Sequence, residues 1–334
     1  MSFRPTDEQR ELKEGVRAFC ASRLGREQIR ALEGRGFDRE LWRELASMGV
    51  LGLRLPEAKG GMGLGVAEAV LVFEELGRAL APGPLVWSQL AAELVTGAAA
   101  GEVVVGGLDL TAGEEGGFLV EHLEALDVLL LLRGDGVYRV EPRAIAAERV
   151  TPLDPLTPVH HAGALPAGER IASAGTAREL HLLGAAITAG EMLGVAEATH
   201  DLAVAYAKER EQFGRPIGSF QAIKHMLADS FVRKEVARAS AFAAAATLDH
   251  HEVGDVAQAV SGAKINAGEA AMKNARTCIQ VHGGMGYTWE VAAHYYLKRA
   301  WVLENRFGTA SAHADSLGAA VFPRREAAGG SARS

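Results

Sequence analysis

Apolar residues recur at helical spacing through the first hundred positions of the chain. Thr6 is a suitable N-cap for a helix that begins at Asp7, and Leu12, Val16 and Phe19 then share one face at spacings of four and three. The same periodicity predicts further helices over residues 38–48, 66–80 and 85–95, with a glycine-rich loop at 55–64. This part of the chain is therefore predicted to be a helical domain, residues 1–100.

Between residues 101 and 171 the pattern changes to short apolar runs. Val103-Val104-Val105, Phe118-Leu119-Val120 and the run 128–132 have the length and composition of strands. Gly134-Asp135-Gly136 lies between the last run and residues 137–140, which is typical of a β-hairpin. Prolines at 152, 155 and 158 keep the following segment extended. We therefore predict a small β domain over 101–171.

From residue 172 onward the chain is again helical. Long alanine-rich stretches predict helices over 177–209, 220–248 and 256–281, and the last residues, 327–334, form a small polar tail expected to fray. The predicted fold class is mainly α with a small β unit, in an α–β–α order, and residues 172–334 form a C-terminal helical bundle.

Charge and composition exclude several classes of function. The chain has 334 residues, of which 42 are acidic and 35 basic, so its net charge is −7 and gives no basic footprint for nucleic acid. Every apolar run, including 128–132, is far shorter than the roughly 20 residues needed to span a bilayer. The N-terminus has no apolar signal segment, and the two cysteines, Cys20 and Cys278, fit a reducing compartment. We expect a cytoplasmic protein without a membrane or nucleic-acid partner.

Two segments at the ends of the predicted long helices suit a planar, phosphate-bearing ligand. Residues 210–217 (Arg-Glu-Gln-Phe-Gly-Arg-Pro-Ile) combine a guanidinium, an aromatic ring and a glycine turn just before the next helix. Residues 280–287 (Gln-Val-His-Gly-Gly-Met-Gly-Tyr) provide a side-chain amide and bare glycine backbone. Taken alone, each segment is more typical of a helix corner or of a helix C-cap followed by a turn than of a ligand site.

In this order, the two segments resemble the acyl-CoA dehydrogenase family. Other matching segments are Gly194-Val195-Ala196-Glu197-Ala198, Tyr206-Ala207, Phe220-Gln221, Leu227-Ala228-Asp229 and Leu55-Pro56-Glu57 with Gly60-Gly61-x-Gly63. The resemblance covers most of residues 3–100 and 176–322. It implies an N-terminal α domain, a middle β domain and a C-terminal four-helix bundle, which is the order that the hydrophobic pattern predicts independently.

The resemblance also implies a flavoprotein that holds FAD across a subunit boundary and dehydrogenates an acyl-CoA thioester. An acceptor similar to electron-transfer flavoprotein would take the electrons. In the family, the two motifs hold the ADP half of an FAD that is bound mainly to the neighbouring subunit. Carried over to this chain, the cofactor-binding residues are Arg210, Phe213, Gly214, Gln221, Gln280, Gly283, Gly284 and Thr309. No metal site is predicted.

The chain departs from the family at the catalytic base. The usual base is the Glu of a Tyr-Glu-Gly-Thr motif, but Phe307 occupies its position here, and a phenyl ring cannot accept a proton. A minority of members place the base, followed by an Arg, early in the first bundle helix, where this chain has Gly184 and Ala185. Because neither position holds an acid, no catalytic residue is predicted.

The middle domain is also shorter than in the family. Full-length members carry a Thr-Glu-Pro…Gly-Ser-Asp segment that hydrogen-bonds the flavin ring within the same subunit. The corresponding residues here, Gly107-Leu108-Asp109-Leu110-Thr111, lack its glutamate and proline. The half of the FAD site that a subunit builds for itself is therefore reduced, whereas the half offered to a neighbour is complete.

Three explanations fit this pattern. The first, which we favour, is a non-catalytic partner in a heterotetramer with a full-length, base-bearing sister subunit that binds most of the acyl-CoA. It resembles the reduced subunits of actinobacterial enzymes that act on sterol side-chain thioesters. The second is a homo-oligomeric enzyme with a relocated base, for which Glu304 and Glu191 are candidates, although surface or ion-paired roles are predicted for both. The third is a structural or binding protein without flavin.

The adjacent histidine pairs His160-His161 and His250-His251 are poor candidates for a metal site. Neighbouring residues on a strand or helix do not share a face, so the two imidazoles of a pair cannot chelate one ion. All four are predicted to be solvated polar residues.

Overall fold

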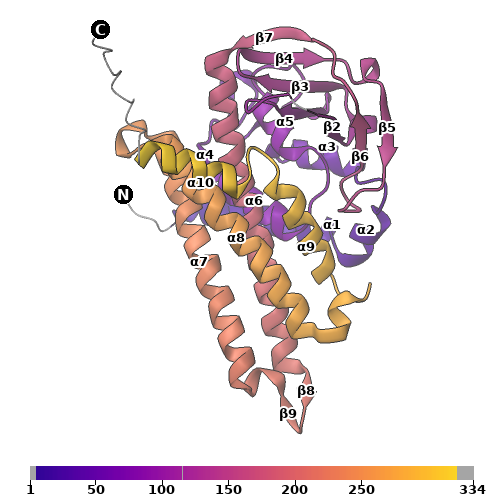
Figure 1. The fold of residues 1–334 in the computed structure, drawn as a ribbon, viewed down its shortest axis with the longest axis vertical. Helices are drawn as coiled ribbons and strands as arrows, with labels where there is room; N and C mark the ends of the chain where they lie inside the picture. The colour runs from indigo at the N-terminus through magenta and orange to yellow at the C-terminus, as the bar shows by residue number, and fades with distance from the viewer. Residues whose placement is uncertain (1–4, 115, 322–334) are drawn as a thin grey trace, which may run out of the picture.

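The computed structural model describes residues 5–114 and 116–321, and the predicted tail 327–334 lies outside them. Helices precede and follow a small region of strands, as Figure 1 shows. The fold is therefore mainly α with a small β unit, as the hydrophobic pattern predicted. Within the described ranges, no helix is long and apolar enough to cross a membrane.

The N-terminal part consists of short helices packed around a common core. Thr6 caps the first helix in a reciprocal pair with Gln9, and Asp38 caps the third through the backbone N–H groups of Glu40 and Leu41. Their buried apolar faces join the main core of the molecule. The helices are α1 (Asp7–Arg23), α2 (Arg26–Ala31), α3 (Arg39–Ser47), α4 (Val66–Arg78) and α5 (Leu85–Ala91).

The β unit contains two small sheets. One sheet has the order β1-β3-β4-β7, with β1 and β3 parallel and the other pairs antiparallel, and the second has the order β2-β6-β5. The predicted hairpin is present, because β3 pairs with β4 across the turn at Gly134-Asp135. The strands are β1 (Val105–Asp109), β2 (Phe118–Glu121), β3 (Val128–Arg133), β4 (Gly136–Val140), β5 (Ala147–Val150), β6 (Val159–Ala162) and β7 (Glu169–Ser173).

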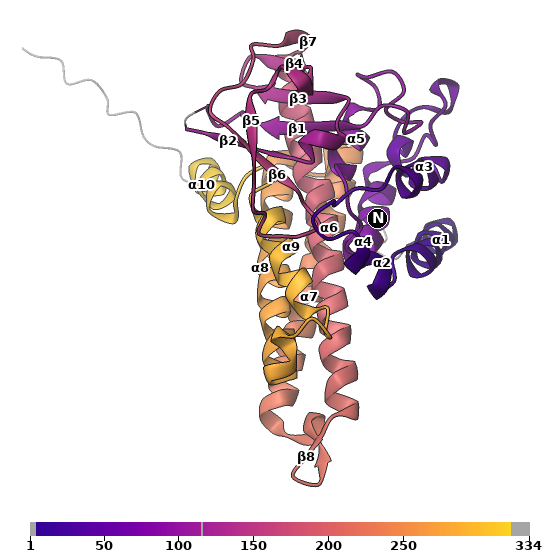
Figure 2. The same cartoon turned by 90° about the vertical axis from the view of Figure 1, so that its right-hand side faces the viewer.

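Three long helices form the C-terminal bundle, and two short ones pack against it. The bundle extends away from the β unit, with α1–α3 on one side of it and α10 on the other (Figure 2). The helices are α6 (Ala174–Glu209), α7 (Gln221–Asp249), α8 (Val256–His282), α9 (Ala293–Glu304) and α10 (Ala310–Val321), with the two-residue strands β8 (Glu211–Gln212) and β9 (Arg215–Pro216) between α6 and α7. The sequence predicted the three long helices to within three residues at each end and a helical chain as far as about Val321, which includes α9 and α10, but it did not predict α2.

Helix α6 is the centre of the molecule, and small residues bring α4 close to it. A Cβ added at Gly194 would lie 1.9 Å from the carbonyl oxygen of Glu74, and one at Gly77 would lie 2.0 Å from that of Glu191. No side chain fits at either contact, so these two glycines allow the helix backbones to touch. Almost every residue of α6 between Leu183 and Ala198 is buried, as expected of a helix enclosed on all sides.

Candidate functional site

The end of the bundle farthest from the β unit presents the first motif to solvent. Helix α6 ends at Glu209, and β8 and β9 form a tight hairpin whose tip is Phe213-Gly214. Both tip residues have positive φ, 53° and 74°, which is the backbone conformation of the tight turns that join short hairpins. The Phe213 side chain is 93% exposed, and Arg210 is exposed at the start of the hairpin.

The second motif lies at the same end, where α8 stops. Gly283 ends the helix with a φ of 58°, and a short 3₁₀ turn follows over Gly283–Tyr287. A Cβ at Gly283 or Gly284 would meet no atom within 4 Å, so this backbone is open to a ligand from outside. Gly286 has a different role, because a Cβ there would lie 2.7 Å from the carbonyl oxygen of Ile279.

A small apolar cluster holds these turns together. It combines the end of α6 (Ala203 and Ala207), the start of α7 (Ile223) and the end of α8 (Cys278 and Ile279). His282 adds a polar contact, since its Nδ1 lies 2.7 Å from the Cys278 carbonyl and its ring stacks on Tyr206 at 4.2 Å. The structure thus brings seven of the predicted cofactor residues to one end of the bundle: Arg210, Phe213, Gly214, Gln221, Gln280, Gly283 and Gly284.

Thr309, the eighth predicted residue, lies apart from the other seven. Its hydroxyl accepts a hydrogen bond from the backbone N–H of Ala312 at 3.2 Å and so caps the start of α10. It belongs to the segment that follows α9, beside the β unit. The two positions where the family carries its base also meet in this part of the molecule.

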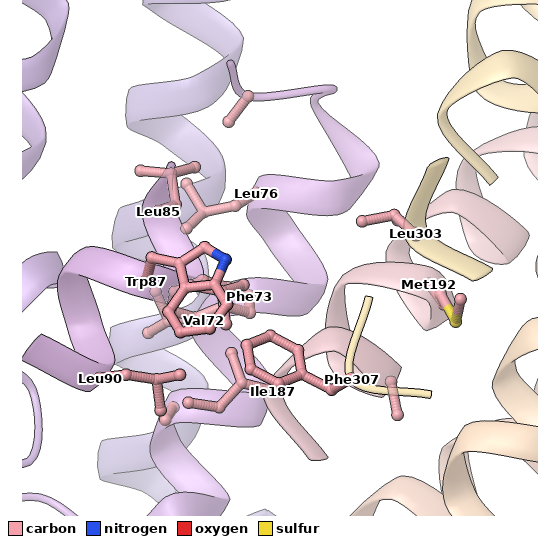
Figure 3. Close-up of a cluster of buried hydrophobic side chains, with 14 of the residues drawn as sticks. Val72, Phe73, Leu76, Leu85, Trp87, Leu90, Ile187, Met192, Leu303 and Phe307 are labelled. Carbon is pink, nitrogen blue, oxygen red and sulfur yellow. The ribbon is translucent and has the colours of Figure 1, made fainter. Parts of the chain in front are cut away.

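Phe307 lies directly on Gly184, so the two base positions are neighbours in space. A Cβ at Gly184 would be 2.4 Å from Cε1 of Phe307, which means that the ring fills the space that a side chain at 184 would need. The ring is 1% exposed, and its centroid lies 4.8 Å from that of Trp87. Figure 3 shows the Phe307 ring beside Trp87 in the core. The two residues that the resemblance places at the family's base positions therefore share one space, which the Phe307 ring fills.

A buried lysine holds the Phe307 segment in place, and sequence reasoning missed it. The Lys264 ammonium donates to the carbonyls of Leu303 (3.2 Å), Glu304 (3.1 Å) and Gly308 (2.8 Å). It thus satisfies the last carbonyls of α9 and fixes the turn that contains Phe307, whose φ is 52°. Burial lowers the pKa of Lys264 to about 8. A lysine in an alanine-rich helix gives no sequence signal of such a role.

A cavity of about 440 Å³ remains beside Phe307, between the β unit and the end of α9. Its lining includes Gly107, Leu108 and Asp109, the residues that stand where the family's flavin-binding segment begins. Trp87 and Phe307 form its aromatic wall, and other lining residues include Leu119, Glu121, Pro152, Leu153, Asp154, Trp301 and Arg306.

The carboxylates that line this cavity are each engaged by other side chains. Glu121 is paired with Arg306 at 2.7 Å, and Asp154 with Arg299 at 2.6 Å. Asp109 accepts from the Thr111 hydroxyl and lies 2.7 Å from Nδ1 of His181. Burial alone would raise the pKa of Asp109, but the contacts with His181 and Thr111 outweigh it and hold the pKa below its usual range.

The two candidates for a relocated base do not line the cavity. Glu191 is 3% exposed and lies between Arg306 (3.4 Å) and Arg299 (3.6 Å), so the predicted ion pairing is present but a surface position is wrong. Burial raises its pKa, although the two arginines oppose this. Glu304 is half-buried and accepts from the backbone N–H of Ala310 at 2.7 Å, which is neither a surface nor an ion-paired role.

The structure corrects the expectation that both residues of the His160-His161 pair are solvated. His160 is buried, whereas its neighbour His161 is exposed, because successive residues of β6 point to opposite faces. The prediction of solvated residues is therefore wrong for His160.

Elsewhere, Glu74, Glu75 and Glu197 form a buried acidic cluster. The cations of Lys13, Arg17 and Arg238 already contact it.

Family models match both helical parts of the chain. Residues 6–100 match the acyl-CoA dehydrogenase N-terminal domain, and residues 177–322 match the acyl-CoA dehydrogenase C-terminal domain. Neither match includes strands β1–β7.

Individual relatives span most of the chain, including the β unit. Acyl-CoA dehydrogenase IpdE2 of Mycobacterium tuberculosis is 36% identical, over 89% of this chain and 92% of that protein. Acyl-CoA dehydrogenase FadE34 of the same organism is 34% identical over 88% of this chain, which corresponds to only 45% of its own length. Among solved structures, a chain of the ChsE4-ChsE5 complex from Mycobacterium tuberculosis superposes with a TM-score of 0.84 at 27% identity, covering 97% of this chain and all of that one.

Proposed function

Because this chain belongs to the acyl-CoA dehydrogenase family of FAD-dependent oxidoreductases, we propose that it is a non-catalytic subunit that completes the FAD site of a sister subunit. The sister is a full-length relative that carries the base and binds most of the acyl-CoA. Together the two chains form a heterotetramer that dehydrogenates an acyl-CoA thioester, with an acceptor similar to electron-transfer flavoprotein.

The observation that carries this proposal is the contact of Phe307 with Gly184. Abstraction of the proton from the carbon next to the thioester requires a carboxylate at the substrate. At the two positions where the family places it, this chain has a buried phenyl ring and the glycine on which that ring lies. A side chain inserted at position 184 would collide with the Phe307 ring, so a base at 184 is incompatible with phenylalanine at 307.

The exposed end of the bundle suits the ADP part of an FAD held by another subunit. Arg210 offers a guanidinium for a phosphate, and Phe213 offers a ring that is almost fully exposed to solvent. Gln280 adds an amide, and the open backbone at Gly283 and Gly284 allows close approach. When bound, FAD supplies the hydride acceptor of the reaction, and the residues of this chain bind and orient its nucleotide part.

A homo-oligomeric enzyme with a relocated base is less well supported. Of the carboxylates considered from the sequence, Glu191 is held between two arginines and Glu304 by a backbone N–H, and neither faces the 440 Å³ cavity. The acids that do line the cavity, Asp109, Glu121 and Asp154, are engaged by His181, Arg306 and Arg299 respectively. A flavin-free structural role would leave the exposed Phe213 and the open glycines without a purpose.

One solved relative is a chain of an assembly, the ChsE4-ChsE5 complex. This supports a heteromeric partner for the present chain. The reduced β unit, with Gly107-Leu108-Asp109 in place of the family's flavin-binding segment, supports the same division of labour.

Expression with and without a full-length sister gene tests the proposal. The chain purified alone is expected to be nearly colourless and to reduce no dye with butyryl-CoA or a bulkier cyclic acyl-CoA. Co-expression with the sister should give a complex with about one FAD per pair of chains and restore turnover. Full FAD occupancy together with turnover by the isolated chain would refute the partner role and favour a relocated base.

A further inference from the structure

A second hollow, of about 340 Å³, lies between the loop that joins α2 to α3 and the edge of the three-stranded sheet. Arg35 and Phe37 line it from the loop, Arg39 lines it from the start of α3, and residues of the β unit line it from the other side. The two walls are locked together at Gly36, whose φ is 57° and where a Cβ would lie 2.2 Å from Cδ of Pro158. The hollow is therefore a built feature of the fold, and its lining shares no residue with the FAD-binding set proposed above.

Two buried histidines line this hollow with unsatisfied ring atoms. His122 is 2% exposed and His160 is 5% exposed, and among the described residues Nδ1 of each has no hydrogen-bond partner. His122 also has a φ of 55°, an uncommon conformation for a residue of its size. A buried polar atom without a partner and a strained backbone both cost free energy, and both are concentrated at functional positions.

The charge of the hollow is positive. Three guanidinium groups line it, those of Arg35, Arg39 and Arg149, against the single carboxylate of Glu124. Arg149 lies 3.5 Å from Glu124, and Arg39 lies 3.6 Å from Asp127 just outside the hollow. The side chain of Arg35 makes its described hydrogen bond only to the Ala31 carbonyl, at 3.0 Å, so its charge is not neutralised there.

We propose that this hollow binds the phosphate group of a small molecule, or free phosphate, through Arg35, Arg39 and Arg149. Guanidinium groups match phosphate oxygens with paired hydrogen bonds, and an anion offsets the positive charge that Glu124 and Asp127 leave unbalanced. At the base of the site His122 and His160 each offer an unpartnered Nδ1, while Nε2 of His160 lies 3.2 Å from Glu124. Burial and the nearby Arg306 and Arg299 lower the pKa of His122 to about 3, so this ring is uncharged at neutral pH. A metal ion would be repelled by the three guanidinium groups.

Calorimetric titration of the full chain with inorganic phosphate, AMP and succinate tests this site. Phosphate or AMP should bind, and the tighter of the two identifies the free ion or a phosphorylated metabolite as the ligand. Replacement of Arg149→Gln should weaken binding about tenfold, which corresponds to the loss of one charge-assisted contact. Because Arg149 also bonds to Gly34 and Glu124, Arg35→Gln is the second variant, and it should weaken binding without loss of folding.

Arg178→Gln is the matched control, since Arg178 is an exposed arginine on α6 that does not line the hollow. It should leave the affinity unchanged. Histidine-labelled NMR gives an independent readout, in which the ring signals of His122 and His160 should shift as phosphate saturates the site. The proposal is overturned if millimolar phosphate gives neither heat nor a shift. It is equally overturned if Arg178→Gln weakens binding as much as Arg35→Gln does, or if succinate binds as tightly as phosphate.

Discussion

Two phenylalanines with the same left-handed backbone conformation, Phe213 at the tip of the β8–β9 hairpin and Phe307 in the turn after α9, have opposite environments. Phe213 and Phe307 have nearly equal positive φ values, 53° and 52°, and each is followed by a glycine of positive φ. Yet the Phe213 side chain is 93% exposed, whereas Phe307 is 1% exposed. The same strained backbone therefore presents one ring to solvent and inserts the other into the core.

The difference in exposure indicates what offsets the backbone strain at each phenylalanine. A bulky residue in the left-handed region costs on the order of 1–3 kcal/mol, which has to be offset elsewhere. Phe307 offsets it within the chain by burying its ring between Gly184 and Trp87. Phe213 has only an edge contact with Phe220 at 6.2 Å, so compensation within its own chain is small. A ligand or subunit that covers Phe213 would supply the rest.

Truncation of each ring separates the two roles most strongly. Phe307→Ala should lower the free energy of unfolding by about 3–5 kcal/mol, because it removes a buried ring and leaves a cavity beside Trp87. Phe213→Ala is the matched variant and should change stability by no more than about 0.5 kcal/mol, but lower FAD retention in the complex with the sister subunit. Urea unfolding followed by fluorescence measures both. Equal stability losses in the two variants would contradict the comparison.

The packing of Phe307 on Gly184 gives a second, smaller effect. Gly184→Ala places a methyl group 2.4 Å from the ring, so the ring has to move, at a cost of about 1–3 kcal/mol. In a Phe307→Ala background the methyl group has room, and the same substitution should cost little. A double-mutant cycle from four urea titrations measures this coupling. Additive losses would mean that the two former base positions do not share one space.

The exposed end should respond to mutation in binding and not in stability. Arg210→Ala removes a charged contact to a phosphate, so FAD retention in the co-expressed complex should fall about tenfold. Arg276→Ala is the control, because Arg276 is an exposed arginine near the end of α8 and outside the two motifs. Flavin content per pair of chains, read from the absorbance after gel filtration, measures the effect. Unchanged flavin after Arg210→Ala would remove its proposed role.

Sequence reasoning succeeded where the local pattern is sufficient. The N-cap at Thr6, the hairpin around Gly134-Asp135 and the three long bundle helices each depend on a few consecutive residues, and the structure confirms them. The cofactor motifs were visible for the same reason, since each lies in one short segment at a helix end. Their contact with FAD stays a prediction.

Long-range contacts could not be read from the sequence. Asp249 at the end of α7 caps α4 through the backbone N–H of Val66, 183 residues earlier. Lys264 holds the Phe307 turn from the middle of a helix, and Trp87 reaches Phe307 from α5. His160 was predicted to be solvated because its strand pairing was unknown. Such contacts depend on how the elements pack, and no local spacing reports it.

The smallest expected effect concerns acid stability at the cavity beside Phe307, which Asp109 lines. The pKa of Asp109 is held below its usual range of about 4 in the folded state, so ionised Asp109 stabilises the fold. This contribution is complete at a pH above the pKa that Asp109 has in the unfolded chain, and it is lost as the pH falls through the pKa that Asp109 has in the folded state. The stability difference between the native chain and Asp109→Asn should therefore be constant between pH 7 and about 5, and shrink below about 4. Urea titrations across this range measure it, with Asp315→Asn as an exposed control that should show no such loss. A stability difference that does not change with pH would mean that the contacts of Asp109 with His181 and Thr111 do not favour its charged form. The region around Phe307 would then depend on apolar packing alone.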